Sequence, residues 1–151
     1  MSKEEVEIIA RGVCIRDGMV LLCHTQGADN TYLPGGHVDF GESAGAALVR
    51  EIQEEMGVES HATEFLGAVE HTFEQKGETH CEVNLVFSLE INGLEPGVTP
   101  KSREAHIDFL WCDVGLLDET ALEPGPIRAI ILKWHGEGMT GGWGSSYPDT
   151  D

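Results

Sequence analysis

The sequence predicts one domain of mixed α and β class, α/β or α+β, on three observations. The chain has 151 residues, which is the size of one ordinary domain and enough to bury a core without a disulfide or zinc ion. Its apolar residues form several short β-rich runs, and two segments between them have helical signals. No repeat or linker interrupts this pattern. We therefore expect a single domain over residues 1–135 and a Gly/Ser-rich tail over residues 136–151.

The first half of the chain is expected to hold two strands, a short extended segment and the main helix. Residues 6–15 and 19–24 are β-rich and flank Arg16-Asp17-Gly18, which is typical of a hairpin turn. Residues 31–33 form an extended segment before a pair of glycines. Residues 43–56 predict a helix, because Ser43 is a suitable N-cap and a glycine at position 57 ends the pattern.

The second half is expected to hold three strands and a short helix. Residues 62–73 and 81–91 are strand-like, and a polar turn at 75–78 joins them. Residues 107–114 predict a further strand, and residues 127–134 a helix opened by a proline. The tail contains two aromatic residues, Trp143 and Tyr147. A flexible end and docking on the same subunit or on a neighbour, as in a homodimer, both stay open.

Composition and charge exclude several classes of partner. The chain has 27 acidic and 9 basic residues, a formal charge of −18, with the acids spread evenly along it. Such a field repels a DNA or RNA duplex, and a small phosphorylated substrate would need a cation to approach. No run approaches the roughly 18 apolar residues of a membrane helix, and the N-terminus lacks a secretory signal. Four cysteines without a CxxC pair indicate free thiols, so we expect a cytoplasmic protein that binds no membrane.

The predicted helix carries three acids on one arc. Glu51, Glu54 and Glu55 stand at i, i+3 and i+4, beside an apolar stripe that includes Ile52. Carboxylates this close repel one another, and a cation would reverse that cost. Carboxylate oxygens suit Mg²⁺ or Mn²⁺ better than zinc. A purely solvent-facing acidic surface stays open as the alternative.

The neighbours of these acids support a binding site. Arg50 can hold one acid in a bidentate bond, and Glu42 can meet the positive end of the helix or join the acids. Gly35 and Gly36 allow the backbone to approach a metal ion or a phosphate closely.

The string from Gly36 to Val58 resembles, at every specified position, the Nudix box GX5EX7REUXEEXGU, in which U is a bulky aliphatic residue. The resemblance implies an α/β/α sandwich with a mixed β-sheet. It also implies an enzyme, a hydrolase that acts on phosphoric anhydrides. Such enzymes hydrolyse nucleoside diphosphates linked to another moiety and use Mg²⁺ or Mn²⁺. The partner would then be a small-molecule nucleotide.

The resemblance also implies residue roles. Glu54, Glu55 and the carbonyl of Gly35 would bind the metal, and Glu51 would be a further ligand or the base that activates water. Arg50 would orient Glu51. On the substrate side, the candidates are Gly36, His37 and Glu42, with His37 beside a phosphate.

Residues outside the box are less strongly indicated. Glu104 precedes the strand at 107–114 and is the candidate for a second catalytic base or an outer metal ligand, while a solvated loop glutamate stays open. Further candidates are polar residues at the strand 81–91 that could line the pocket and aromatic residues that could stack on a base: His80, Glu82, Asn84, Tyr32 and Phe40. Ordinary surface or core roles for the polar residues, and packing for the aromatic ones, stay open.

Subfamily and activity leave alternatives. The compact layout and early hairpin are most similar to the mutator-type nucleotide pyrophosphohydrolases. A non-catalytic Nudix module that binds a nucleotide ligand as a regulator is the competing class, although such modules often lose box acids. Isomerase-like chemistry on the same fold would use Cys81 and Glu82, but no surrounding motif supports it.

Overall fold

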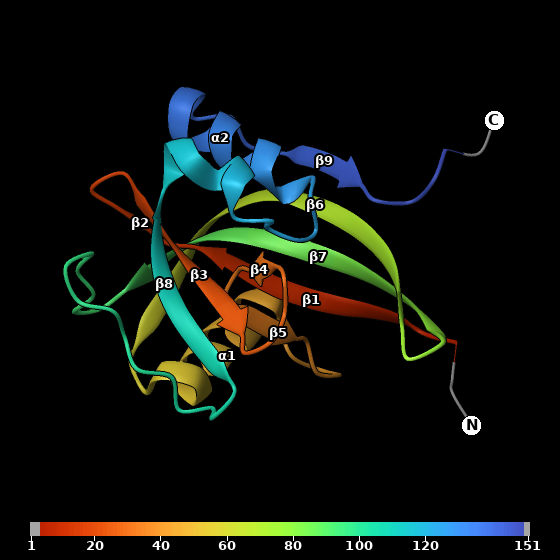
Figure 1. Ribbon diagram of the computed structural model, residues 1–151, viewed down its shortest axis with the longest axis horizontal. Helices are drawn as coiled ribbons and strands as arrows, with labels where there is room; N and C mark the ends of the chain where they lie inside the picture. Colours follow the sequence, from red (N-terminus) through yellow and green to blue (C-terminus); the bar gives the residue numbers. More distant parts are fainter. Residues whose placement is uncertain (1–3, 150–151) are drawn as a thin grey trace.

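The computed structural model describes residues 4–149, which form two β-sheets, two α-helices and a 3₁₀ helix (Figure 1). The strands are β1 (Val6–Val13), β2 (Ile15–Arg16), β3 (Met19–Thr25), β4 (Thr31–Tyr32), β5 (Gly35–His37), β6 (Ser60–Gln75), β7 (Glu78–Ile91), β8 (Ile107–Asp113) and β9 (Gly142–Ser145). The helices are α1 (Ala44–Met56), the 3₁₀ helix η1 (Val114–Glu119) and α2 (Ile127–Glu137).

The larger sheet has the order β5-β1-β7-β6-β9. Strand β1 runs parallel to β7, and β6 runs parallel to β9, while the other pairs are antiparallel. A smaller sheet combines β2, β3 and β4, with β8 pairing on β3. The predicted class is confirmed, because a mixed sheet lies between helices that pack on its two faces.

Alternation along the strands of the larger sheet creates two cores. Ala10 of β1 and Leu89 of β7 face α1, where they pack with Leu48 and Ile52. On the other face, buried residues of β6 and β7 pack against α2 and the smaller sheet: Leu66, Val69, Val86, Leu22, Ile127 and Ile131. The two helices are therefore fixed to opposite faces of one sheet.

Helix α1 has the predicted ends. The Ser43 hydroxyl accepts a hydrogen bond from the backbone N–H of Ala46 at 3.1 Å, as an N-cap does. Gly57 follows the helix in the left-handed conformation, with φ of 72°, and its N–H donates to the Gln53 carbonyl. Helix α2 begins at the predicted residue and runs to Glu137, one turn beyond the predicted end.

The predicted first hairpin is right at its turn and wrong in its length. Asp17 and Gly18 both have positive φ, as a tight two-residue turn requires. Only Ile15 and Arg16 pair with β3, whereas β1 pairs with β5 and β7. The chain passes from one sheet to the other near Cys14, so one apolar run in the sequence serves two sheets.

The C-terminal segment forms strand β9 along β6. Gly142 and Gly144 allow this packing, because a Cβ at Gly142 would lie 2.9 Å from Ile130, and one at Gly144 would lie 2.4 Å from Pro126. The glycines predicted to belong to a tail thus let β9 fit beside α2. Trp143, on the opposite face of β9, remains largely exposed.

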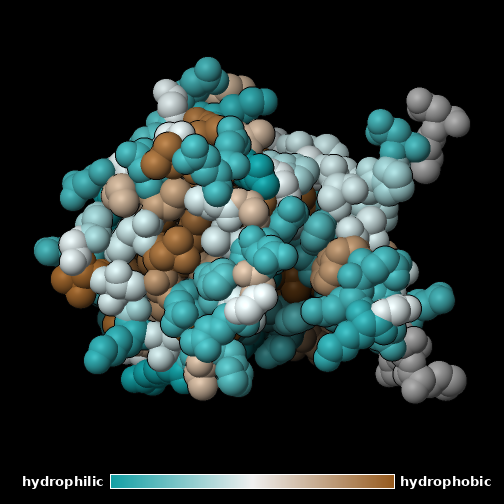
Figure 2. Space-filling model, in the orientation of Figure 1, coloured by the Kyte–Doolittle hydropathy of each residue, from teal (hydrophilic) through white to brown (hydrophobic). Residues whose placement is uncertain are grey.

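The surface agrees with the acidic composition. Hydrophilic side chains cover most of the face seen in Figure 2. No helix among residues 4–149 combines the length and apolar content needed to span a bilayer.

Candidate active site

The three acids of α1 differ in their burial. Glu55 is buried, with 6% of its surface exposed, because it points toward the sheet beside the apolar stripe. The Glu51 side chain is 17% exposed, and the Glu54 side chain is 54% exposed. One arc of the helix therefore leads from solvent into the protein, as the spacing predicts.

Arg50 lies at the centre of the acidic cluster. Its Nε donates to Glu42 at 2.8 Å, and its Nη1 donates to Glu51 at 3.1 Å and to Glu54 at 3.2 Å. Its Nη2 donates to the carbonyl of His37 at 3.0 Å and to Glu42 at 3.0 Å. The arginine thus joins the loop before α1 to two of the acids. The His37 ring is turned to Glu7, with its Nε2 3.2 Å from that carboxylate.

The acids respond to this environment in different directions. Burial, followed by the charge of Glu51, raises the pKa of Glu55 to about 8. Burial also raises the pKa of Glu51, although Arg50 opposes the shift. Hydrogen bonds from Arg50 lower the pKa of Glu42. The innermost acid therefore carries the largest unfavourable free energy of ionisation, which an added positive charge would relieve.

Two glycines leave room beside the acids. A Cβ at Gly36 would lie 2.5 Å from the carboxyl carbon of Glu51, so a side chain there would displace that carboxylate. Gly35 has φ of 139°, and a Cβ there would lie 1.9 Å from the carbonyl oxygen of Ala10. The strand before α1 can therefore approach both β1 and the acids only with glycine at these positions.

The donor set fits a hard divalent cation. Glu55 Oε2 is buried without a hydrogen-bond partner, and carboxylates are the ligands that Mg²⁺ and Mn²⁺ prefer. Within residues 4–149, no three His, Cys, Asp or Glu side chains converge closely enough to hold a metal ion. Arg50 accounts for this, since it draws Glu51 and Glu54 toward itself. Binding would use the Oε2 atoms of these two carboxylates, which Arg50 does not bond, turned toward Glu55.

The structure brings Glu104 near the acids. Its loop is docked on the end of α1, because the Arg103 N–H donates to the Glu55 carbonyl at 2.8 Å. The Arg103 side chain also lies against Gly57, where a Cβ would be 2.1 Å from a guanidinium nitrogen. Burial is the main cause of the raised pKa values of Glu51 and Glu55. The negative charge of Glu104 is a smaller cause that raises both pKa values further. The role of Glu104 as a base or outer ligand stays a prediction.

A cavity of about 650 Å³ lies beside β1, β4 and the β6–β7 hairpin. Its lining comes from β1, β4, the β6–β7 hairpin and the loop after η1: Arg11, Asn30, Tyr32, His71, Phe73, Gln75, Glu82, Glu123 and Pro124. Glu82 is buried and accepts a hydrogen bond from Asn84 at 3.1 Å. The rings of His71 and Phe73 stack with centroids 5.0 Å apart, and the rings of Phe73 and His80 also stack with centroids 5.0 Å apart.

Arg11 connects this cavity to the acids, and sequence reasoning missed it. Its guanidinium lies 5.5 Å from the centre of the Tyr32 ring, and Nη1 donates to the Leu33 carbonyl at 3.0 Å. Its Nε is buried without a partner. Its positive charge opposes the rise in the pKa of Glu55. A single cation within an otherwise apolar strand was the signal in the sequence.

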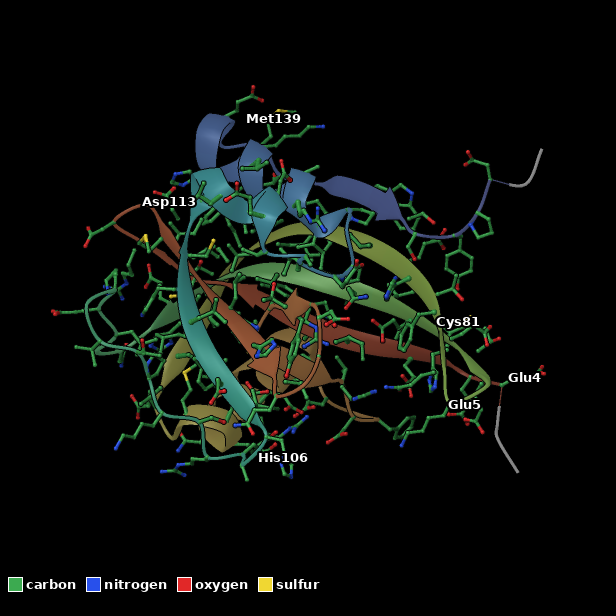
Figure 3. The ribbon with its side chains drawn as sticks, in the orientation of Figure 1. Glu4, Glu5, Cys81, His106, Asp113 and Met139 are labelled. Carbon is green, nitrogen blue, oxygen red and sulfur yellow. The ribbon has the colours of Figure 1, made fainter. Side chains whose placement is uncertain are left out.

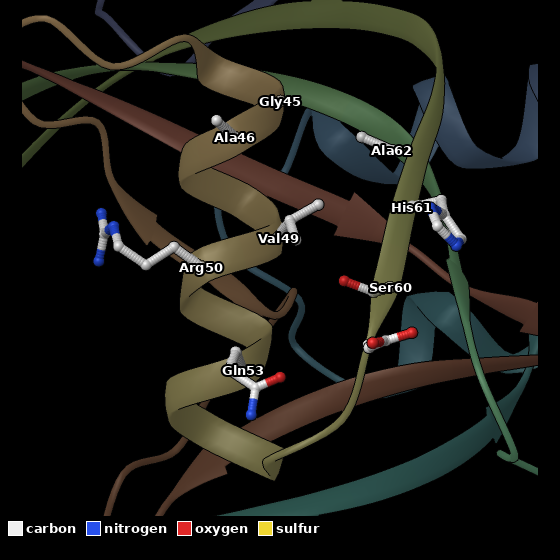
Figure 4. Close-up of a pocket in the computed structure, with 9 residues that line it drawn as sticks. Gly45, Ala46, Val49, Arg50, Gln53, Ser60, His61 and Ala62 are labelled. Atoms are coloured by element: carbon white, nitrogen blue, oxygen red, sulfur yellow. The ribbon is translucent and has the colours of Figure 1, made fainter.

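Two further features complete the surroundings of α1. Phe40 is fully exposed, so it is not a packing residue here, and its stacking on a base stays a prediction. A groove of about 800 Å³ runs between α1 and β6 (Figure 4). Val49 points toward Ser60 across this groove, whereas Arg50 extends to the other side of the helix. None of the three α1 acids lines it.

Comparisons with known proteins agree with this geometry. The model of the NUDIX domain family matches residues 7–134. An ADP-ribose pyrophosphatase from Methanocaldococcus jannaschii is 27% identical over 82% of this chain and 71% of that protein. The crystal structure of a MutT NUDIX hydrolase from Burkholderia pseudomallei is 27% identical, with a TM-score of 0.59 over 74% of this chain and 86% of that one. A NUDIX hydrolase from Nitrosomonas europaea is 19% identical and has the same fold, with a TM-score of 0.67 over 91% of this chain and 93% of that one. The chain belongs to the Nudix family of hydrolases.

Proposed function

We propose that this Nudix hydrolase cleaves the phosphoric anhydride of a nucleoside diphosphate linked to another moiety, with Mg²⁺ or Mn²⁺ at the acids of α1. One observation carries the proposal. Glu55 is buried beside Glu51 with an unpartnered oxygen and a pKa raised to about 8, an arrangement that is unfavourable without a cation. A competing role as a binding module would not require this cost.

The residues would divide the work as follows. Glu51, Glu54, Glu55 and the carbonyl of Gly35 would hold the cation. That cation would offset the negative charge of the diphosphate and make a water molecule more acidic. Glu51 or Glu104 would accept the proton as water attacks phosphorus and the anhydride P–O bond breaks. Arg50 would orient Glu51.

The substrate would extend from the acids into the cavity. We propose that Arg11 binds a phosphate oxygen with its free Nε, since that donor is buried and has no partner. Tyr32 and the stacked pair of His71 and Phe73 offer ring faces to a base. Gly36 and His37 would border the diphosphate. Glu42 is held by Arg50, so it would act on the substrate side through that arginine.

The experiment that tests this function is a substrate panel with product identification. Purified protein with Mg²⁺ is given ADP-ribose, a UDP-sugar, a dinucleoside polyphosphate, dGTP and ATP. ADP-ribose is the first choice, because a relative 27% identical is an ADP-ribose pyrophosphatase. We expect at least one compound to be cleaved at the anhydride and cleavage to stop in excess EDTA. Tight binding without turnover of any compound would favour a regulatory module, and turnover in EDTA would contradict the metal site.

The cellular compartment and the oligomeric state of the enzyme are also proposals. All four cysteines are free, which supports a reducing compartment such as the cytoplasm. A homodimer stays a prediction that sedimentation equilibrium of the full chain would test.

A further inference from the structure

The C-terminal segment reaches the wall of the cavity, although the family match ends at residue 134. The hydroxyl of Ser146 lies 2.6 Å from Nδ1 of His71, a residue that lines the cavity. The same oxygen accepts a hydrogen bond from the backbone N–H of Thr72 at 3.0 Å. One serine beyond the family match therefore contacts both the ring and the backbone of this part of β6.

The segment is firmly attached at this point. Strand β9 pairs with β6 from Gly67 to Glu70, and the Ser146 N–H donates to the Glu70 carbonyl at 3.0 Å. The Ser146 hydroxyl accepts from the Thr72 N–H, so both the backbone and the side chain of this serine are held by β6. Figure 3 labels Cys81 near the far end of the β6–β7 hairpin. These two bonds fix the position of the hydroxyl.

The bond between this hydroxyl and Nδ1 of His71 can run in either direction, according to which ring nitrogen carries the proton. Donation by Ser146 gives the hydroxyl hydrogen an acceptor within the protein, whereas the Thr72 N–H can only donate to the same oxygen. A hydroxyl that donates to Nδ1 leaves the proton of the neutral imidazole on Nε2. His71 then presents an N–H donor from a ring that is also held by stacking on Phe73.

We propose that Ser146 is a positioning residue that holds His71 as an Nε2–H donor toward an acceptor atom of the bound nucleoside. The C-terminal segment then completes the substrate site instead of serving as a passive end. This inference rests on the proposed function, because it assigns the cavity to the nucleoside. It adds a substrate contact that depends on residues beyond the family match.

The first test needs no substrate and is therefore independent of the proposed function. Long-range ¹H–¹⁵N spectra of the full chain, recorded where His71 is neutral, report which ring nitrogen carries the proton. We expect the proton on Nε2 in the wild type and a shift of the Nδ1 resonance toward its free value in Ser146→Ala. A wild-type ring with the proton on Nδ1 would overturn the proposal.

The second test is a double-mutant cycle in steady-state kinetics. Its substrate is the compound of the panel that is hydrolysed fastest among ADP-ribose, a UDP-sugar, a dinucleoside polyphosphate, dGTP and ATP. Ser146→Ala should raise KM about 5-fold, the effect of one hydrogen bond, and change kcat less than about 2-fold. In a His71→Ala background, the same change should alter KM less than about 2-fold, because its target is gone. An equal effect of Ser146→Ala in both backgrounds would contradict positioning through His71.

Two variants separate positioning from general loosening of the segment. Ser146→Thr keeps the hydroxyl, so its KM should stay close to the wild-type value. The proton of the neutral His71 ring should stay on Nε2. Ser145→Ala removes the neighbouring hydroxyl, which bonds the carboxylate of Glu70 and lies outside the cavity. It should leave KM unchanged. If Ser145→Ala matched Ser146→Ala in both KM and ring resonances, a structural effect of the segment would replace the proposal.

Discussion

Helix α1 and the cavity beside β1 and the β6–β7 hairpin present their functional residues in different ways. The acids of α1 lie within one helical turn, so spacing alone brings Glu51, Glu54 and Glu55 together. The cavity collects side chains from four strands and two loops, separated by up to about 110 residues. The functional residues of a short helix can be predicted from their spacing in the sequence. Those of a cavity wall can be identified only when the fold is known.

Arg50 and Arg11 also differ, in how many of their hydrogen-bond donors are already used within the protein. Arg50 donates to three carboxylates and a carbonyl, so its hydrogen bonds are already used within the protein. Arg11 donates to one carbonyl and keeps a buried Nε without a partner. We therefore expect Arg50 to organise the acids and Arg11 to bind substrate.

The largest effect is expected at the helix. Glu54→Gln and Glu55→Gln should each lower kcat by at least about 10²-fold, because each removes one charge from the proposed metal site and keeps the side-chain volume. Steady-state kinetics at subsaturating Mg²⁺ measure the effect. Glu59→Gln, an exposed glutamate just after α1, is the matched control and should behave as the wild type. A wild-type kcat in either variant would remove that residue from the essential ligands.

A smaller effect on kcat is expected in the loop that docks on α1. Glu104→Gln should lower kcat by about 10²-fold if it is a base and less if it is an outer ligand, with a smaller change in KM. The rivals Glu82→Gln and Glu78→Gln are measured beside it at saturating Mg²⁺. Glu82 lies in the cavity and Glu78 at the exposed hairpin turn, so neither should match Glu104. Loss of kcat in a rival alone would assign the outer acid to the hairpin.

The cavity should respond in KM instead of kcat. Arg11→Met should raise KM by about 10-fold or more, because a charged hydrogen-bond donor to the substrate is lost. Arg16→Met is the control, since Arg16 donates to a single carbonyl, that of Ile91, and does not line the cavity. A change in kcat without a change in KM would mean that Arg11 serves the acids and not the substrate.

The last prediction concerns stability without metal instead of turnover. The pKa of Glu55 is raised from 4.5 to about 8 on folding, so the folded state binds the extra proton and loses stability as pH rises through this range. Above pH 8, the cost is on the order of a few kcal/mol. In EDTA, Glu55→Gln should therefore melt several degrees above the wild type at pH 9 and near it at pH 5. Melting curves with the same pH dependence for both proteins would contradict the burial of an ionised Glu55.

The sequence predicted the mixed class, both helices and most strands, because their signals are local. Ser43 and Gly57 mark the ends of α1 through backbone chemistry that depends on a few residues. The pairing of β1 with β7 and of β9 with β6 joins distant segments, and no local pattern specifies it. The glycines of the tail are compatible with a flexible end or a docked segment, and close packing of Gly142 and Gly144 against α2 shows that this part is docked. Arg11 and His71 are far apart in the sequence, so only the fold shows that they line one cavity.

The most direct test of the central claim, that the acids of α1 form a divalent metal site, is the binding of Mn²⁺ followed by electron paramagnetic resonance. The account predicts saturable binding to the wild type and at least about 10-fold weaker binding to Glu54→Gln and Glu55→Gln, with Glu59→Gln unchanged. Equal Mn²⁺ affinity in the wild type and both α1 variants would contradict it.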